Sequence, residues 1–425
     1  MARRSTRSKT YLTLVASRDS WIHRKVETID FLPDGSTRNK ISYDFTAPLN
    51  LKPFAKGAQI GIPITLMKKN TLVNLSVKDA NSKSLSVWDT QSTGDLGFEI
   101  LRSVIVGFIK RPLNNLESES LNKIVFSKPT DQIEPQLQVV ENALTSNLSG
   151  SPIALEIIRG FITSLIENYI FVVEIPISEL GSRQIIKISH DQELLGGMKA
   201  EKFWLLRVKF LIPRNTFLPS AKSSHLEINS PEGVQILGLD HSTYDVNSKT
   251  WLVDRSSETS GHVAHIHINE DFYSASKYIL RMSPSGSGLI LQTFVGISAG
   301  LAYYFFILKD ICQIDSLITT PSEAAGLATI SLAIPAFLLT QVSRAREHSH
   351  VQRILRIPRV IALLSSVCFF ISAGSLVIGM SRLRFLDLSR GLSALQLALW
   401  VAIYVYMLDC RWFAGFPRKS ASTVD

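Results

Sequence analysis

The residues whose types and spacing come nearest to a metal site are three histidines close together in the chain, His262, His265 and His267. Side chains on a β-strand alternate between its two faces, so His265 and His267 would project from one face. His262 would lie just outside that pair or across the strand. Imidazole is a common ligand of zinc and copper, but two ligands do not complete a site. A third ligand would come from elsewhere in the fold, the candidates being His225, His241 and Glu270.

The exposed polar face of an edge strand explains the same spacing, and the rest of the chain offers little catalytic chemistry. Neither a Walker loop, Gly-x-Ser-x-Gly nor His-Glu-x-x-His occurs. The glycine-rich residues 283–288 lack the lysine that contacts a phosphate and predict a linker. Residues 189–191 and 240–242 each place Ser, His and Asp side by side, but catalytic triads assemble across a fold. We therefore predict no catalytic residue and no cofactor, with a metal-dependent hydrolase or transferase as the enzymatic alternative.

The hydrophobic content of this 425-residue chain is 45%, and it is concentrated after residue 286. A chain of this length has room for two or three domains. An apolar run needs about 20 residues to cross a bilayer as a helix. The sequence therefore predicts a bundle of four transmembrane helices, at 288–308, 324–342, 360–380 and 391–408.

None of the four predicted spans contains Asp, Glu, Lys, Arg or His, which disfavours a transporter or proton pump. Gln292, Gln341 and Gln396 are expected to make interhelical or interfacial hydrogen bonds. Gly296 and Gly300 form a small-residue face that allows two helices to approach closely. We expect it to serve packing within the bundle, with homo-oligomer formation as the alternative.

Orientation is predicted from Lys and Arg near the span ends. Ten of them lie on the side of the soluble region and the C-terminus, against four on the other side. The prediction is a multi-pass protein of the bacterial inner membrane, with the N-terminal region and the tail at 409–425 in the cytoplasm. The loop between the second and third spans is expected to contact lipid headgroups through five arginines, Arg344, Arg346, Arg353, Arg356 and Arg359.

The soluble region is predicted to be α+β. Residues 1–95 favour a β-rich domain, because strand patterns at 21–32 and 38–45 flank the turn signal at 33–36. Helical spacing begins near Phe98 and predicts a helical segment over 96–167, with the polar stretch 112–130 as a connector. Seven short strand patterns then predict an antiparallel β-sandwich of immunoglobulin-like type over 168–283.

The net charge of +9 does not indicate a polyanion partner. Residues 1–286 hold 33 Lys and Arg against 29 Asp and Glu, and the basic residues before position 10 account for that surplus. We therefore exclude nucleic acid as a predicted partner and expect a solvated basic N-terminus that could touch anionic lipid. The first 311 residues contain no cysteine, which fits a reducing compartment.

Three segments, at 38–48, 63–69 and 75–80, together resemble the opening of a loose group of uncharacterised bacterial membrane proteins. That resemblance implies a β-rich N-terminal region followed by four spans, and no activity. We predict a membrane-anchored cytoplasmic module that binds or senses an unknown protein or small-molecule ligand, with the lipid bilayer as its other partner. The alternative is a membrane-perturbing effector or pore gated by the soluble domain.

Overall fold

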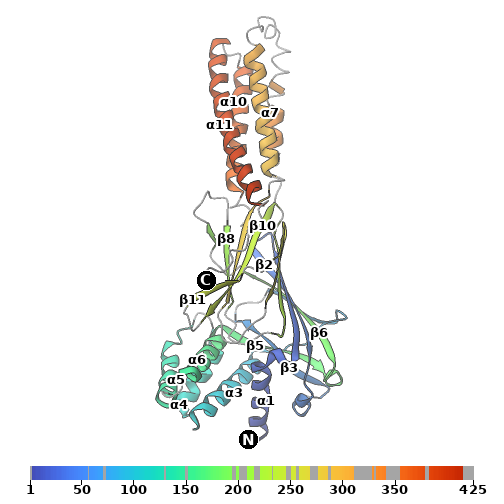
Figure 1. Ribbon diagram of the computed structural model, residues 1–425, viewed down its shortest axis with the longest axis vertical. Helices are drawn as coiled ribbons and strands as arrows, with labels where there is room; N and C mark the ends of the chain where they lie inside the picture. The colour runs from blue at the N-terminus through green and yellow to red at the C-terminus, as the bar shows by residue number, and fades with distance from the viewer. Residues whose placement is uncertain are drawn as a thin grey trace, which may run out of the picture.

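The computed structural model places a helical bundle at one end of a long molecule, β-sheets in the middle and a second group of helices at the other end (Figure 1). The N-terminus lies at the end opposite the bundle. The structure describes residues 2–55, 57–69, 73–128, 131–148, 152–193, 198–200, 208–214, 221–231, 233–245, 250–254, 258–268, 276–285, 289–310, 328–329, 332–340, 355–378 and 382–414.

A seven-stranded sheet forms one layer of the middle part. Its strands, in spatial order, are β12 (Glu258–Ser260), β13 (Val263–Ile268), β9 (Ser224–Asn229), β1 (Ile22–Phe31), β2 (Ser36–Thr46), β6 (Arg183–Glu193) and β4 (Val73–Asp79). β1 and β2 form the predicted antiparallel hairpin, and the positive φ of Gly35 closes its turn. β1 also pairs in parallel with β9, a strand some 200 residues later in the chain.

A five-stranded sheet packs against it, with the order β11 (Thr250–Asp254), β10 (Val234–Asp245), β14 (Ser276–Pro284), β8 (Val208–Arg214) and β7 (Met198–Ala200). The core between the sheets joins aliphatic side chains such as Ile228 and Ile266 to Leu239 and Leu280. The predicted immunoglobulin-like type is not confirmed, because the seven-stranded sheet contains a parallel pair and takes strands from both 1–95 and 168–283.

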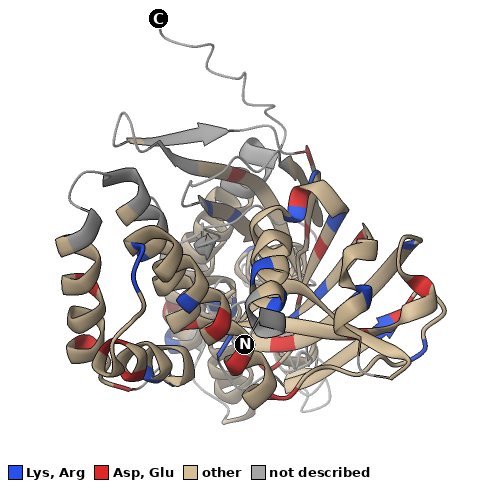
Figure 2. Cartoon of the chain, turned by 90° about the horizontal axis from the view of Figure 1, so that it is seen from below, with Lys and Arg blue, Asp and Glu red and all other residues tan. Residues whose placement is uncertain are grey.

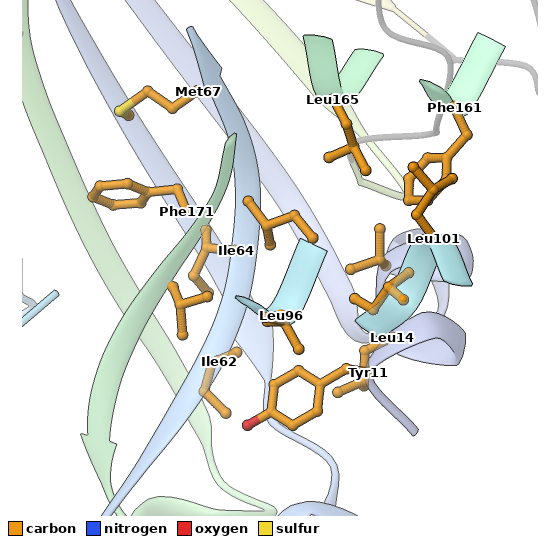
Figure 3. Close-up of a cluster of buried hydrophobic side chains, with 14 of the residues drawn as sticks. Tyr11, Leu14, Ile62, Ile64, Met67, Leu96, Leu101, Phe161, Leu165 and Phe171 are labelled. Carbon is orange, nitrogen blue, oxygen red and sulfur yellow. The ribbon is translucent and has the colours of Figure 1, made fainter. Parts of the chain in front are cut away.

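A two-stranded ribbon of β3 (Gln59–Lys68) and β5 (Asn168–Pro176) carries the helices at the far end. These helices are α1 (Ala2–Ala16), α3 (Thr90–Ile109), α4 (Asn115–Phe126), α5 (Glu134–Leu148) and α6 (Pro152–Glu167), with the short α2 (Arg18–Trp21), η1 (Leu49–Phe54) and η2 (Ile177–Glu179) beside them. Figure 3 shows Leu96, Leu101 and Phe161 of this layer in one buried cluster with Ile62 and Ile64 of β3. The helices thus cover the ribbon with one continuous apolar core.

The predicted connector at 112–130 contains helix α4, so that prediction is wrong. Asn114 accepts a hydrogen bond from the backbone of Glu117, and the Glu117 carboxylate accepts one from the backbone of Asn114. This capping box begins the helix. Leu121 and Ile124 then bury its inner face.

The basic N-terminus belongs to helix α1, whose apolar side chains are buried, so it is not a wholly solvated segment. Tyr11 and Val15 have no exposed surface, and Leu14 is also buried. The Tyr11 hydroxyl donates to the carbonyl of Gly61 at 2.9 Å. The guanidinium of Arg7 lies 5.6 Å from the Tyr11 ring centroid, so one of the basic residues is part of this contact.

Three helices among the described residues are long and apolar enough to cross a membrane: α7 (Leu289–Asp310), α10 (Arg356–Val377) and α11 (Arg382–Ala414). Of the predicted span at 324–342, the structure describes 328–329 and 332–340, and these residues are helical. Four spans are therefore not confirmed. Arg384 and Arg390, which the prediction places in a loop, belong to the first turns of α11.

Candidate functional site

A histidine cluster, formed by His225, His265 and His267, lies on the outer face of the seven-stranded sheet, the face turned away from the five-stranded sheet. β9 and β13 are antiparallel neighbours, and His225 stands directly opposite His267. The intervening side chains, such as Leu226 and Ile266, point into the core between the sheets. Strand alternation therefore puts all three imidazoles on the outer face.

The imidazoles contact one another. His225 Nδ1 lies 3.2 Å from His265 Nε2, and the two rings stack with centroids 5.3 Å apart. The centroids of His225 and His267 are 4.7 Å apart. The hydroxyl of Ser223 lies 3.2 Å from His225 Nε2 and 3.1 Å from His267 Nε2, so it joins the two rings.

His262 does not belong to this group. Its Nδ1 lies 3.0 Å from the carbonyl of Val234 and 3.2 Å from the hydroxyl of Ser230. The structure therefore brings together two of these three histidines with His225, one of the three candidates for a further ligand. His241 points inward and stacks on Tyr278, and Glu270 lies outside the described residues. No group of three His, Cys, Asp or Glu side chains within the described part of the chain stands ready to hold a metal ion.

Several charges surround the histidine cluster. Partial burial lowers the pKa of His225, and the nearby Arg24, His267 and His265 lower it further. Glu227 of β9 and Glu258 of β12 both stand directly opposite His265. Because directly opposed residues share a face, these carboxylates provide negative charge beside the cluster.

An outer-face network of cross-strand pairs extends from the cluster across the same sheet. Asp30 accepts a hydrogen bond from Asn229 at 2.7 Å and pairs with Lys40 at 2.7 Å. Farther along, Asp191 accepts two hydrogen bonds from Arg38, at 2.7 and 2.9 Å, and one from Asn74 at 2.6 Å. These hydrogen bonds lower the pKa of Asp191 to about 2. The members of the outer-face network are Asn229, Asp30, Lys40, Arg38, Asp191 and Asn74.

The two Ser-His-Asp sequences do not form triads. His190 is buried on the inner side of the sheet, whereas its neighbour Asp191 pairs with Arg38 on the outer face. Asp240 pairs with Arg281, while His241 turns the other way and stacks on Tyr278. Adjacent strand residues face opposite sides, so neither sequence can assemble a nucleophile with its base.

Polar side chains in the bundle hydrogen-bond to other helices. Gln396 is fully buried, and its amide donates to the carbonyl of Ser365 at 3.1 Å, as the sequence analysis expects of an interhelical residue. The indole of Trp400 donates to the hydroxyl of Ser298 at 2.9 Å. The sequence does not predict this pair, because nothing in either helix alone indicates its partner. Gln292 is half-buried in α7, and Gln341 lies outside the described residues.

The two glycines of α7 lie against other helices of the bundle. A Cβ on Gly296 would come within 2.4 Å of Leu338, and one on Gly300 within 2.5 Å of Phe369. Both glycines therefore provide space for close packing within one chain.

Two of the five arginines predicted to contact lipid, Arg356 and Arg359, lie in the first turn of α10, at the bundle end nearest the sheets. The other three, Arg344, Arg346 and Arg353, lie outside the described residues. The residue before this turn, Leu355, is buried in the core between the sheets. The first turn of α10 therefore lies at the boundary between the sheets and the bundle.

The charged side chains at the far end of the molecule do not gather into a patch of one sign. Figure 2, which views the molecule from that end, shows Lys and Arg interspersed with Asp and Glu on the described elements. No protein-family model matches the chain, and no curated protein matches it. The function is therefore argued from the histidine cluster, the outer-face network and the bundle.

Proposed function

We propose that the protein is a membrane-anchored module that binds or senses a ligand on the outer face of its seven-stranded sheet. The observation that carries the proposal is the character of this face, which combines the histidine cluster with the outer-face network. Lys40 of that network keeps 56% of its side-chain surface exposed. Exposed polar groups held rigidly on paired strands suit recognition, because their positions are fixed before a ligand arrives.

The bundle fits an anchor better than a conduit. The apolar parts of α7, α10 and α11, at 289–308, 360–377 and 391–408, contain no Asp, Glu, Lys, Arg or His. Gln396 and Trp400 direct their polar atoms to partners within the bundle. Pathways for ions or protons ordinarily need polar or charged groups at membrane depth.

A fourth crossing belongs to this proposal. α7 begins and α10 begins at the same end of the bundle, since Leu289 and Leu355 both pack against the core between the sheets. The chain must therefore return across the bundle between Asp310 and Leu355, a distance of about 30 Å for a helix of some 20 residues. The helical residues 332–340 lie on that return path, with Leu338 close to Gly296.

We place the sheets on the cytoplasmic side of a bacterial inner membrane. Arg356 and Arg359 lie at the sheet end of the bundle, and Lys and Arg near the ends of membrane spans favour the cytoplasmic side, whereas Asp and Glu have little effect. Lipid headgroups would be the partners of these arginines.

Site-specific photocrosslinking in living cells tests the binding role. A photoreactive amino acid at Lys40 should give a discrete adduct, identified by mass spectrometry, because this position lies on the proposed binding face. The matched control is the same amino acid at Glu119, an exposed residue of α4. An absence of adducts at Lys40, or the same adducts at both positions, would contradict the proposal.

The second candidate, an effector or pore gated by the soluble part, is favoured by one contact. Leu355 precedes α10 directly and is buried between the sheets, so a movement of the sheets would reach the bundle. Purified protein in dye-loaded vesicles separates the two functions. An anchor retains the dye, whereas a pore-forming effector releases it.

A further inference from the structure

The separation of two imidazole nitrogens in the histidine cluster matches that of two ligands on one metal ion. Zinc binds imidazole nitrogens at about 2.0–2.1 Å in a tetrahedral arrangement, which puts two ligating nitrogens about 3.3–3.4 Å apart. His225 Nδ1 and His265 Nε2 are 3.2 Å apart. The paired strands β9 and β13 hold both side chains on one face, and a bound ion would replace the hydrogen bond between these two nitrogens.

We propose that His225, His265 and His267 bind a divalent transition-metal ion, with zinc as the test case. The proposal rests on the proposed binding role of the outer face and names the class of its ligand. A site of imidazoles alone suits zinc, copper or nickel better than the oxygen-seeking calcium or magnesium. The fourth position would remain open to water or to a donor atom of a partner.

His267 must turn to become the third ligand. Its Nε2 lies 3.1 Å from the hydroxyl of Ser223, while its ring centroid is 4.7 Å from that of His225. Rotation about the side-chain bonds of this exposed residue exchanges the Ser223 contact for the ion. This exchange explains why three ligands do not already converge among the described residues.

Nearby charges act on such a site in opposite directions. Glu227 and Glu258 stand opposite His265 on its two neighbouring strands and would attract a cation. Arg24 lies on the neighbouring strand β1, two residues before Val26, which stands directly opposite His225, and its positive charge would repel a cation. Replacing Arg24 by Ala should therefore strengthen metal binding, whereas a histidine cluster with only a structural role would show no such response.

The test is competition for zinc between the full-length protein, purified in detergent with a tag that contains no histidine, and a chromogenic chelator. We expect one zinc ion per chain. His265→Ala should weaken binding at least tenfold, and Arg24→Ala should tighten it. The matched control is His262→Ala, which removes a histidine three positions away whose imidazole contacts Val234 and Ser230 instead.

Two results would overturn the proposal: zinc binding below one ion per ten chains, or equal loss of zinc in the His262 and His265 variants. His265→Asn, with an unchanged melting temperature, guards against a simple folding defect. The assay needs no partner, so its failure is distinct from a failure of crosslinking at Lys40. If the protein does not bind zinc but still gives an adduct at Lys40, the proposed binding role holds and only the metal site is rejected.

Discussion

Asp191 illustrates at the scale of a single residue how the outer face is held together. Three hydrogen bonds from Arg38 and Asn74 lower the pKa of its carboxyl from 3.8 to about 2. Because the unfolded chain takes up the proton first, this contribution to stability is complete above about pH 4 and is lost as the pH falls toward 2. Asp191→Asn should remove that part of the acid dependence.

Thermal melting of the full-length protein between pH 2 and 5 measures this effect. The control is Asp95→Asn, which changes an exposed carboxylate on α3. If the wild type and Asp191→Asn lose stability in parallel across this range, the three hydrogen bonds do not stabilise the fold.

Lys69 is the opposite case, a charge that the fold disfavours. Burial lowers its pKa from 10.5 to about 8, although its ammonium donates to the carbonyl of Val125 at 2.6 Å. Between pH 8 and 10 the unfolded chain therefore holds more protons, and stability should rise with pH. The side chain is only half-buried, so solvent screening reduces the effect to about 1 kcal/mol.

The slope of stability against pH over this interval, measured by urea unfolding, should be smaller in Lys69→Met. Lys123→Met alters an exposed lysine in the last turn of α4 and serves as the control. A slope in the Lys69 variant equal to that of the wild type would show that another group titrates.

At the scale of elements, helix α1 is an integral part of the core at the far end. Leu14 is 3% exposed and packs with Tyr11 and Leu101 in the apolar cluster of Figure 3. Leu14→Ala should destabilise the protein by about 2–4 kcal/mol, because it leaves a cavity among close-packed side chains. Thr13→Ala, one exposed position earlier, should change stability by less than about 0.5 kcal/mol. Equal melting temperatures for the two variants would mean that α1 does not pack as described.

The elements that local patterns predicted are those whose structure depends on nearby residues. The β1–β2 hairpin follows from its turn, and the last helix of the predicted helical segment, α6, ends at the predicted residue 167. α4 was not predicted, because most of its residues are polar and its buried apolar face is short. Asn114 and Glu117 nevertheless fit the pattern of a capping box. α1 was missed because its basic charge suggested solvation, while only every third or fourth residue enters the core.

Only part of the candidate site was predicted, because the site depends on which strands pair with each other. Strand alternation correctly puts His265 and His267 on one face. The position of His225 depends on the pairing of β9 with β13 and β1, and these strands are far apart in the sequence. Strand periodicity shows which residues share a face, but it does not show which strands are neighbours.

At the scale of the whole molecule, the joint between the sheets and the bundle decides whether the protein unfolds as one unit. Leu355 is 3% exposed and lies in the same core as Leu239 and Leu280 of the five-stranded sheet. The next residue begins α10. Leu355 therefore links the core between the sheets to α10. Leu289 at the start of α7 packs against the same core and forms a second link.

Leu355→Ala should uncouple the unfolding of the sheets from that of the bundle, because the resulting cavity removes packing contacts between these two parts. We expect calorimetry of the full-length protein in nanodiscs to show one transition for the wild type and two for this variant, the earlier one lowered by several degrees. Leu363→Ala, at a 42% exposed position of α10, removes the same atoms away from the joint and should keep the single transition. Two transitions in the wild type would show that the sheets and the bundle are already independent, which would remove the argument for a gated effector over an anchored binding module.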